Sequence, residues 1–426
     1  MRGGLCWTLG LAMTLSAVPW FCGGLQAEEA SSLRLVPFPK EVKIQTGRFA
    51  LDRPLVLTTA SEQAKLLGEM IAGELKRAGV AAPKVQTVAP TGEAEKNALV
   101  LSTAGAKGLG ETHARAGATP EDYVLQVHAD GVRIQGQGPA GLFYGVASLC
   151  QLIRANRQGT NLPCLTIRDW PSIRWRAYQD DLTRGPSSTL DTLQREVRLG
   201  AGLKMNVFTY YMEHQYAFSK HPVIGPAGGS LLPEELKALV AYAQPWHVDI
   251  LGNQQSFGHF YHILKHNEYA ALSENASKWV VSPVNEDSYR LLDDMYSEVI
   301  PLLPFPFFNV CCDETGGLGT GASKPLADKI GVGGVYARHL RRLHDLLKDK
   351  YGKRMMMWGD IILHHPENLK EIPTDTIMLT WGYHAEDSFE NQIIPFAKSG
   401  YEFFVCPGVN NWNRILPDFN EGRPKI

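Results

Sequence analysis

From about residue 170 to its end, the chain alternates between short apolar segments and longer segments with helical periodicity. The apolar segments, each typical of a buried strand, are Arg176–Leu182, Met205–Tyr211, Val248–Gln254, Phe307–Cys312, Arg354–Trp358, Thr376–Trp381 and Glu402–Cys406. Between them, apolar residues recur at helical spacing, as in Leu236–Ala243 after Pro233. This alternation predicts an α/β fold, a TIM-type (β/α)8 barrel over residues 170–426. A doubly wound sheet is the alternative.

The alternation yields seven strand candidates, whereas a closed barrel of this type has eight. The chain ends at Ile426, soon after the seventh candidate, with no eighth strand or closing helix in the pattern. An open barrel would leave a strand edge unpaired. We therefore expect a barrel truncated after its seventh strand, either because the sequence is a fragment or because the barrel closes in an unusual way.

Residues 33–165 show mixed strand and helix signals. Tyr123–Val127 and Val132–Gln135 flank an Asp-Gly pair, which tolerates the positive φ of a tight hairpin turn. Pro139–Gly145 then opens an apolar helical stretch that ends near Ile153. These signals predict a small α+β domain ahead of the barrel.

The amino terminus has Arg2, an apolar run that reaches Phe21, and then Gly23–Ala27 before the acidic pair Glu28-Glu29. This pattern is typical of a secretory signal peptide, so residues 1–27 are expected to be cleaved and the protein exported to the periplasm or the extracellular space. An uncleaved membrane anchor is the alternative. No later run is long and apolar enough to span a bilayer.

Five cysteines lie outside the signal: Cys150, Cys164, Cys311, Cys312 and Cys406. The last three lie in apolar, strand-like runs and are expected to be buried thiols. Cys150 and Cys164 flank a polar connection, and in an exported protein they either pair as a disulfide or remain free. No cysteine spacing resembles a zinc site.

The formal net charge of -2 over 426 residues gives no reason to expect nucleic acid or an anionic membrane surface as a partner. Small neutral substrates fit this charge better. The sequence does not indicate the oligomeric state.

Two adjacent carboxylates, Asp313 and Glu314, follow an apolar run and precede the glycine-rich stretch Thr315–Gly321. Neighbouring residues on a regular strand face opposite ways, so both acids face one site only where the backbone turns. The carboxyl ends of parallel strands carry the chemistry in such folds, and two close carboxylates are expected to keep one proton near neutral pH. The pair is therefore a candidate catalytic site; a solvated or capping pair is the alternative.

These segments resemble glycoside hydrolase family 20, the β-N-acetylhexosaminidases, and within it the branch that includes hexosaminidase D. The resemblance rests on Leu35–Lys40, Pro139–Gly145, Trp175–Arg184, Gln254–His266 and the acid pair. It implies that residues 33–165 are the family's non-catalytic amino-terminal domain and that residues 170–426 are its catalytic barrel.

The resemblance also implies roles for single residues. Asp313 and Glu314 match the family's catalytic pair, although Cys311-Cys312 departs from the glycine and alanine common before it. Arg184 corresponds to the arginine that holds sugar hydroxyls, and His259 to a histidine close to the acids. The aromatic residues expected around the sugar and its acetamido group are Trp358, Trp381, Tyr383 and Trp412.

The second strand departs from the better-known branches, because Asn206–His214 lacks their histidine and aspartate pattern. Glu213 is the substitute we expect for recognition of the far hydroxyls. In the family, the eighth strand normally brings another tryptophan and an acidic residue to the sugar. The pattern of this sequence shows no such strand.

The resemblance implies hydrolysis of terminal β-linked N-acetylglucosamine or N-acetylgalactosamine from glycans with retention of configuration. The substrate's own acetamido oxygen attacks the anomeric carbon, Asp313 stabilises the oxazolinium intermediate, and Glu314 acts as acid and then base. No metal or organic cofactor is required. The alternatives are a non-catalytic carbohydrate-binding protein and a conventional two-carboxylate glycosidase that uses a second acid such as Asp360.

Overall fold

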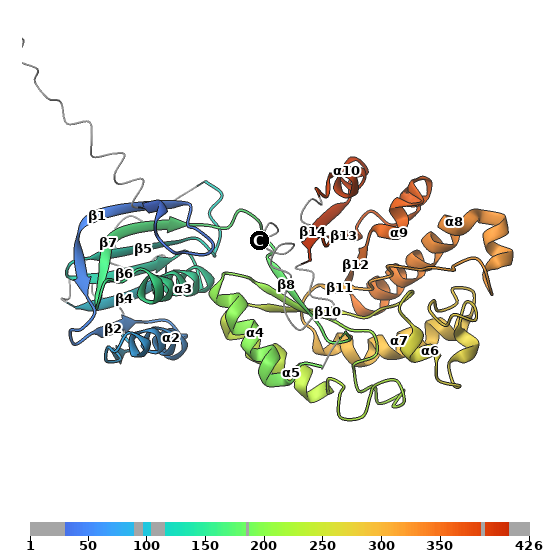
Figure 1. Ribbon diagram of the computed structural model, residues 1–426, viewed down its shortest axis with the longest axis horizontal. Coiled ribbons are helices and arrows are strands. Elements are labelled where there is room, and N and C mark those ends of the chain that lie inside the picture. Colours follow the sequence, from blue (N-terminus) through green and yellow to red (C-terminus); the bar gives the residue numbers. More distant parts are fainter. Residues whose placement is uncertain (1–29, 89–96, 104–115, 185–186, 385–387, 409–426) are drawn as a thin grey trace, which may run out of the picture. The chain divides into compact units, whose positions relative to one another are not determined.

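The computed structural model describes residues 30–88, 97–103, 116–184, 187–384 and 388–408. The predicted signal peptide and Trp412 lie outside the described residues. The chain divides into two compact units, Met1–Ser172 and Ile173–Ile426 (Figure 1). Within the described ranges, no helix combines the length and the apolar character needed to cross a bilayer.

The first unit is built on a mixed seven-stranded sheet in the order β1-β7-β5-β6-β4-β2-β3. Its strands are β1 (Glu41–Ala50), β2 (Val56–Thr59), β3 (Lys84–Gln86), β4 (Ala98–Thr103), β5 (Tyr123–His128), β6 (Gly131–Gly136) and β7 (Asn161–Asp169). Two helices, α2 (Ala64–Arg77) and α3 (Pro139–Ala155), pack on each other, and α3 also packs on β4, β5 and β6. The hairpin predicted around the Asp-Gly pair is confirmed, since β5 and β6 pair antiparallel across it.

Two glycines of the Pro139–Gly145 segment let α3 approach the sheet closely. A Cβ atom on Gly141 would lie 2.3 Å from the carbonyl oxygen of Asp122, and one on Gly145 would lie 2.4 Å from Cγ2 of Ile134. Real side chains do not come this close, so any larger residue would push the helix off the strands.

We expect Gly141→Ala to destabilise the protein by about 1–3 kcal/mol, because the new methyl group overlaps the Asp122 carbonyl. Gly73→Ala is the matched control: Gly73 is exposed on α2 with nothing within 4 Å of an added Cβ, so alanine there should stabilise by up to ~1 kcal/mol. Urea unfolding of the two variants measures both changes. Equal stability of Gly141→Ala and the wild type would contradict the close packing of α3 on the sheet.

Cys150 and Cys164 are both free and buried, so the disulfide alternative is wrong for this structure. Strand alternation explains the separation. Leu165 and Ile167 of β7 pair with β5 residues on the face that α3 covers, which places Cys164 on the opposite face, beside Gly47. Cys150 lies on α3, where burial raises the pKa of its thiol to about 12.

The second unit is built on a seven-stranded sheet in which every neighbouring pair is parallel. Its strands are β8 (Ala177–Asp181), β9 (Val207–Tyr211), β10 (Asp249–Asn253), β11 (Phe307–Asn309), β12 (Arg354–Trp358), β13 (Ile377–Gly382) and β14 (Glu402–Pro407). The helices between them are α4 (Leu190–Gly202), α5 (Pro233–Ala243), α6 (Tyr261–Leu264), α7 (Glu286–Val299), α8 (Lys324–Asp345), α9 (Asp360–Leu363) and α10 (Glu390–Lys398).

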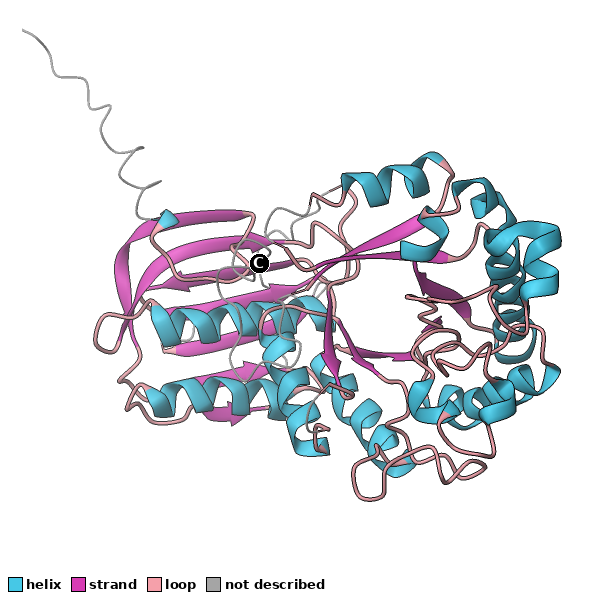
Figure 2. Ribbon diagram, turned by 45° about the vertical axis from the view of Figure 1, so that its right-hand side comes forward, coloured by secondary structure: helices cyan, strands magenta, loops and turns pink. Residues whose placement is uncertain are grey.

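The spatial order of these strands follows the sequence without reversal, from β8 at one edge to β14 at the other. A doubly wound sheet would reverse direction near its middle, so the barrel-type prediction is confirmed and the alternative is wrong. Figure 2 shows the sheet curled, with helices along its outer side. Among the described residues the seven predicted strands are all present, and β8 and β14 have no strand between them.

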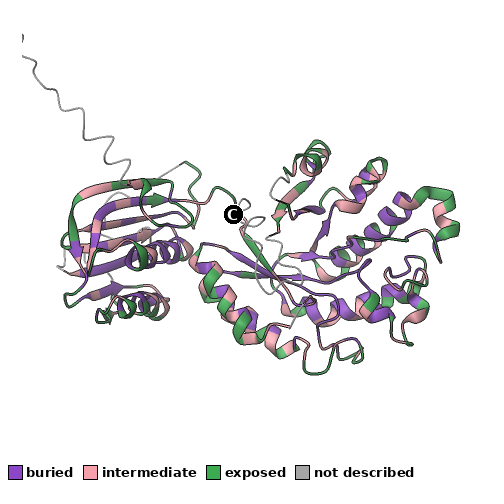
Figure 3. Ribbon diagram, viewed as in Figure 1, coloured by how far each residue is buried: buried purple, intermediate pink, exposed green. Residues whose placement is uncertain are grey.

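Alternate residues of these strands fill the inside of the curled sheet. One buried cluster draws Val207 and Tyr211 from β9, Met356 and Trp358 from β12, and Leu379 from β13. Members on the same strand are two or four residues apart, as expected for side chains that share one face. Figure 3 shows most of these strands buried, whereas the helices carry exposed residues.

Candidate active site

The candidate site residues within the described ranges lie at the carboxyl ends of the strands of the second unit. Arg184 follows β8, Glu213 follows β9, His259 follows β10, Asp313 and Glu314 follow β11, Trp358 ends β12, and Trp381 and Tyr383 lie at the end of β13. Because the strands are parallel, these ends meet at one edge of the sheet, as in other barrels of this type.

The backbone turns where it delivers the two acids. β11 ends at Asn309, three residues before the end of the predicted strand, and Cys311, Cys312 and Glu314 have left-handed φ angles of 60°, 66° and 47°. This conformation costs about 1–2 kcal/mol for each residue other than glycine. The turn allows two neighbouring carboxylates to reach one histidine.

Side chains from flanking segments hold this strained backbone. Gln255 accepts a hydrogen bond from the N–H of Cys312 at 3.3 Å, and its amide nitrogen donates to Asp313. The hydroxyl of Tyr336 on α8 donates to the carbonyl of Cys312 at 2.9 Å. These contacts offset part of the conformational cost and fix Asp313 before any substrate binds.

His259 lies among three carboxylates. Its Nδ1 is 3.2 Å from Oε1 of Glu213, and its Nε2 is 3.2 Å from Oε2 of Glu314 and 3.4 Å from Oδ2 of Asp313. The imidazole is only 6% exposed, and this burial alone would lower its pKa. The three carboxylates outweigh burial and raise the pKa to about 11, so His259 is an imidazolium at neutral pH.

Arg184 shares Glu213 with His259. Its Nη1 is 2.7 Å from Oε1 of Glu213, and the hydroxyl of Tyr211 donates to the same oxygen at 3.1 Å. Burial opposes the charge of Arg184, but Tyr211, Glu213 and Asp181 together raise its pKa. Glu213 thus contacts two cations at the site, and its role in binding sugar hydroxyls stays a prediction.

The expectation that the adjacent acids keep a proton near neutral pH is wrong for Glu314. The His259 cation lowers the pKa of Glu314 and outweighs the effect of burial. The carboxyl that titrates near neutrality is Asp360, whose pKa rises to about 7 because it is buried and lies close to the Asp313 charge. The adjacency of Asp313 and Glu314 in the sequence does not show that His259, which follows another strand, places a positive charge beside them.

Two side chains contact the backbone of Glu314. Oδ2 of Asp360 accepts a hydrogen bond from its N–H at 3.2 Å, and Nε1 of Trp279 donates to its carbonyl at 2.7 Å. Asp360 follows β12, where strand-end reasoning already pointed. Trp279 was missed, because it lies in the connection between β10 and α7 and neither periodicity nor a strand end marks it.

The predicted aromatic residues are placed at two depths. Trp358 is 8% exposed and belongs to the buried cluster inside the sheet, together with Cys311. Trp381 and Tyr383 are partly exposed, with ring centroids 5.2 Å apart. Burial and the charges of Asp313 and Glu314 raise the pKa of Tyr383, so its hydroxyl lies within electrostatic reach of both acids.

We expect the stability that His259 contributes to decrease as pH rises. Its folded pKa of about 11 exceeds the unfolded value of about 6.5, so the contribution is complete below pH 6.5 and is lost progressively toward pH 11. Urea unfolding of the wild type and His259→Gln at pH 6 and pH 9 measures this. The advantage of the wild type should be larger at pH 6, by up to ~1.4 kcal/mol per pH unit. An advantage that grows with pH would contradict the charged state.

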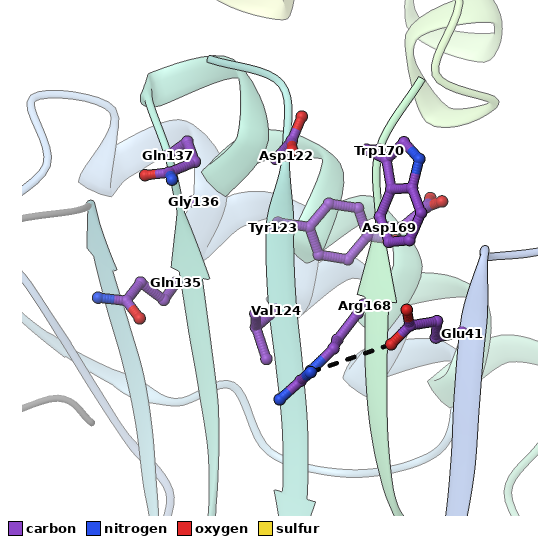
Figure 4. A pocket seen from close by; sticks show the side chains of 10 residues that line it. All are labelled: Glu41, Asp122, Tyr123, Val124, Gln135, Gly136, Gln137, Arg168, Asp169 and Trp170. Atoms are coloured by element: carbon purple, nitrogen blue, oxygen red, sulfur yellow. Dashed lines mark hydrogen bonds and ion pairs between the residues drawn. The ribbon is translucent and has the colours of Figure 1, made fainter. Parts of the chain in front are cut away.

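Other features of the described residues do not add to this site. No group of three or more histidine, cysteine, aspartate or glutamate side chains there is arranged to hold a metal ion. A cavity of about 210 Å³ lies within the first unit, and Figure 4 shows Gln135, Val124, Arg168 and Glu41 side by side along it. None of the candidate site residues lines this cavity.

Two family models match the chain, one for each unit. The model described as glycosyl hydrolase family 20, domain 2, matches residues 32–170, and the model described as glycosyl hydrolase family 20, catalytic domain, matches residues 174–411.

Curated relatives and solved structures give the same picture. A beta-hexosaminidase of Porphyromonas gingivalis is 22% identical over 374 residues, which are 79% of this chain and 46% of that protein. A beta-hexosaminidase of Vibrio furnissii is 22% identical over 94% of this chain and 67% of its own length. The crystal structure of a GH20 exo β-N-acetylglucosaminidase from Vibrio harveyi, in complex with N-acetylglucosamine, superposes with a TM-score of 0.69 at 19% identity, covering 88% of this chain and 60% of that one. The chain thus spans about half the length of the first relative. Its superposition on the last structure shows that the two share a fold.

Proposed function

The chain belongs to glycosyl hydrolase family 20, and from this premise we propose that it removes terminal β-linked N-acetylglucosamine or N-acetylgalactosamine from glycans. The observation that carries the proposal is the meeting of Asp313, Glu314, His259 and Arg184 at the carboxyl ends of parallel strands. The names of the beta-hexosaminidase relatives and the N-acetylglucosamine bound to the Vibrio harveyi enzyme support the substrate class.

In the proposed reaction the acetamido oxygen of the substrate attacks the anomeric carbon, and the bond from that carbon to the leaving oxygen breaks. Glu314, which must bind a proton before this step because His259 lowers its pKa in the free site, gives that proton to the leaving oxygen, while Asp313 accepts the acetamido N–H and stabilises the positive oxazolinium ring. Water then attacks the anomeric carbon and loses a proton to Glu314, while the bond from that carbon to the acetamido oxygen breaks, which restores the acetamido group and the acid.

The surrounding residues prepare these steps. Tyr383 orients the acetamido oxygen, and Trp381 offers a flat ring beside it. His259 offsets the repulsion between the carboxylates of Asp313 and Glu314. Arg184, held by Glu213 at the same end of the sheet, binds the sugar hydroxyls.

The test of this proposal is release of nitrophenol from the 4-nitrophenyl β-glycosides of N-acetylglucosamine and N-acetylgalactosamine, with and without a thiazoline inhibitor. A thiazoline mimics the cyclic intermediate, so it should block turnover competitively. Turnover that a thiazoline leaves unchanged would favour the conventional two-carboxylate mechanism. A folded protein with no turnover would favour the non-catalytic carbohydrate-binding alternative.

Two finer assignments complete the proposal. We place the chain near hexosaminidase D within the family, on the Gln254–His266 segment. We also propose export, with cleavage near Ala27, on the pattern of the first residues. Detection of the mature amino terminus outside the cytoplasm by mass spectrometry tests the second assignment.

A further inference from the structure

We propose that Trp279 is a positioning residue for the acid Glu314, fixing where its carboxyl group meets the leaving oxygen. This inference rests on the proposed function, because a positioning role has meaning only if Glu314 transfers a proton. It assigns a task to a side chain that neither the strand ends nor the acid pair marks.

Trp279 restrains the peptide group of Glu314 directly. Its indole Nε1–H donates to the Glu314 carbonyl at 2.7 Å, and Asp360 accepts from the Glu314 N–H at 3.2 Å. The φ of Glu314 is 47°, a left-handed value that a residue other than glycine adopts only when its surroundings hold it there. Side chains on both sides of the residue therefore fix a backbone conformation that the chain would not adopt by itself.

The same indole also touches the cation that faces the Glu314 carboxylate. The ring centroids of Trp279 and His259 are 4.5 Å apart at an interplanar angle of 53°, and Nε2 of His259 is 3.2 Å from Oε2 of Glu314. An imidazolium against an indole ring is stabilised by the ring's negative face. Trp279 thus holds the acid at two points, through its backbone carbonyl and through His259.

The segment that carries Trp279 is itself anchored to the loop that follows the acids. The backbone N–H of Phe260 donates to the Trp279 carbonyl at 2.9 Å, next to His259. Nδ2 of Asn275 donates to the carbonyl of Gly317 at 3.1 Å and to the hydroxyl of Thr320 at 3.0 Å. These hydrogen bonds fix the backbone around Trp279, so its indole can hold the Glu314 carbonyl in one position.

The expected consequence depends on the leaving group. An unactivated sugar leaves only when Glu314 protonates its oxygen, and a displacement of about 1 Å at a reacting group costs on the order of 10²-fold in rate. A nitrophenolate leaves without full protonation, so its release tolerates a displaced acid. A positioning residue should therefore matter much more for the first kind of substrate.

The experiment compares Trp279→Phe with the wild type on N,N′-diacetylchitobiose and on 4-nitrophenyl N-acetyl-β-glucosaminide. Phenylalanine keeps an aromatic ring on His259 but has no N–H for the Glu314 carbonyl. We expect kcat/KM, which reports the first step alone, to fall about tenfold or more on the disaccharide and to change less than about threefold on the aryl glycoside. Trp246→Phe, which replaces a partly buried tryptophan stacked on Tyr242, is the matched control and should leave both rates unchanged.

Equal losses on the two substrates, or no loss on either, would overturn the inference. Trp279→His is a second variant, because its ring again has an N–H donor. It should recover part of the disaccharide rate that Trp279→Phe loses. Failure to recover that rate counts against the inference, even if one variant is less stable. A wild type inactive on both substrates would instead overturn the proposed function, and the inference with it. The two failures are therefore distinguishable.

Discussion

Replacing Asp313 with asparagine is expected to slow hydrolysis of N-acetylhexosaminides by about 10²–10³-fold without unfolding the protein. The negative charge of Asp313 is needed as positive charge develops on the oxazolinium ring, so the loss should appear in kcat. Asparagine keeps an oxygen that can accept from the Gln255 amide, which preserves the contact that fixes this side chain. Nitrophenol release and thermal unfolding, measured on the same preparation, separate the two effects.

The control for this variant is Asp287→Asn, which changes an exposed carboxylate on α7. It should leave the rate unchanged and lower the free energy of unfolding by no more than about 1 kcal/mol. The inhibition constant of the thiazoline is a second measurement. The inhibitor mimics the cyclic intermediate, so it should bind Asp313→Asn more weakly because the negative charge of Asp313 is gone. Undiminished turnover in Asp313→Asn would sink the substrate-assisted mechanism.

Glu314→Gln is expected to lower the rate by about 10²–10⁴-fold on disaccharides, because general acid catalysis is lost in the step that breaks the glycosidic bond. On the nitrophenyl substrate the first step should suffer far less, since nitrophenolate needs little help to leave. A series of aryl glycosides with leaving groups of increasing pKa measures the dependence. The variant should show a steeper fall in rate with leaving-group pKa than the wild type.

Glu390→Gln, an exposed residue in the first turn of α10, is the matched control for this change. If Glu314→Gln slowed every substrate by the same factor, Glu314 would be acting on binding or structure, and the acid would have to be sought elsewhere. Asp360, whose pKa of about 7 suits proton transfer, would then be the next candidate.

The architecture of the second unit was predictable from the sequence because it depends on local patterns. Apolar segments of strand length alternate with helical periodicity, and each predicted segment overlaps one of the strands β8 to β14. The end of β11 was placed too late, since apolar character continues through Cys312 while the backbone has already turned at Cys311. Periodicity reports burial and cannot distinguish a buried turn from a buried strand.

The candidate site was predictable only in part. Asp313, Glu314, Arg184 and His259 could be singled out from strand ends and from the family resemblance, and the structure brings these four together. The protonation states could not be predicted, because they depend on which strands deliver their side chains to one point. Trp279 stayed hidden for the same reason, since only the fold carries the β10–α7 connection to the acid.

The balance of charge around His259 has a consequence for which glycans can enter the site. Glu213, Asp313 and Glu314 contribute three carboxylates, whereas His259 and Arg184 contribute two cations, and Asp181 adds a further carboxyl group 3.7 Å from Arg184. A uronic acid, a sialic acid or a sulfated hexosamine would therefore meet a surplus of its own sign in a partly desolvated site. Neutral sugars escape this penalty, so we expect acidic glycans to be poorer substrates of the proposed reaction than neutral ones.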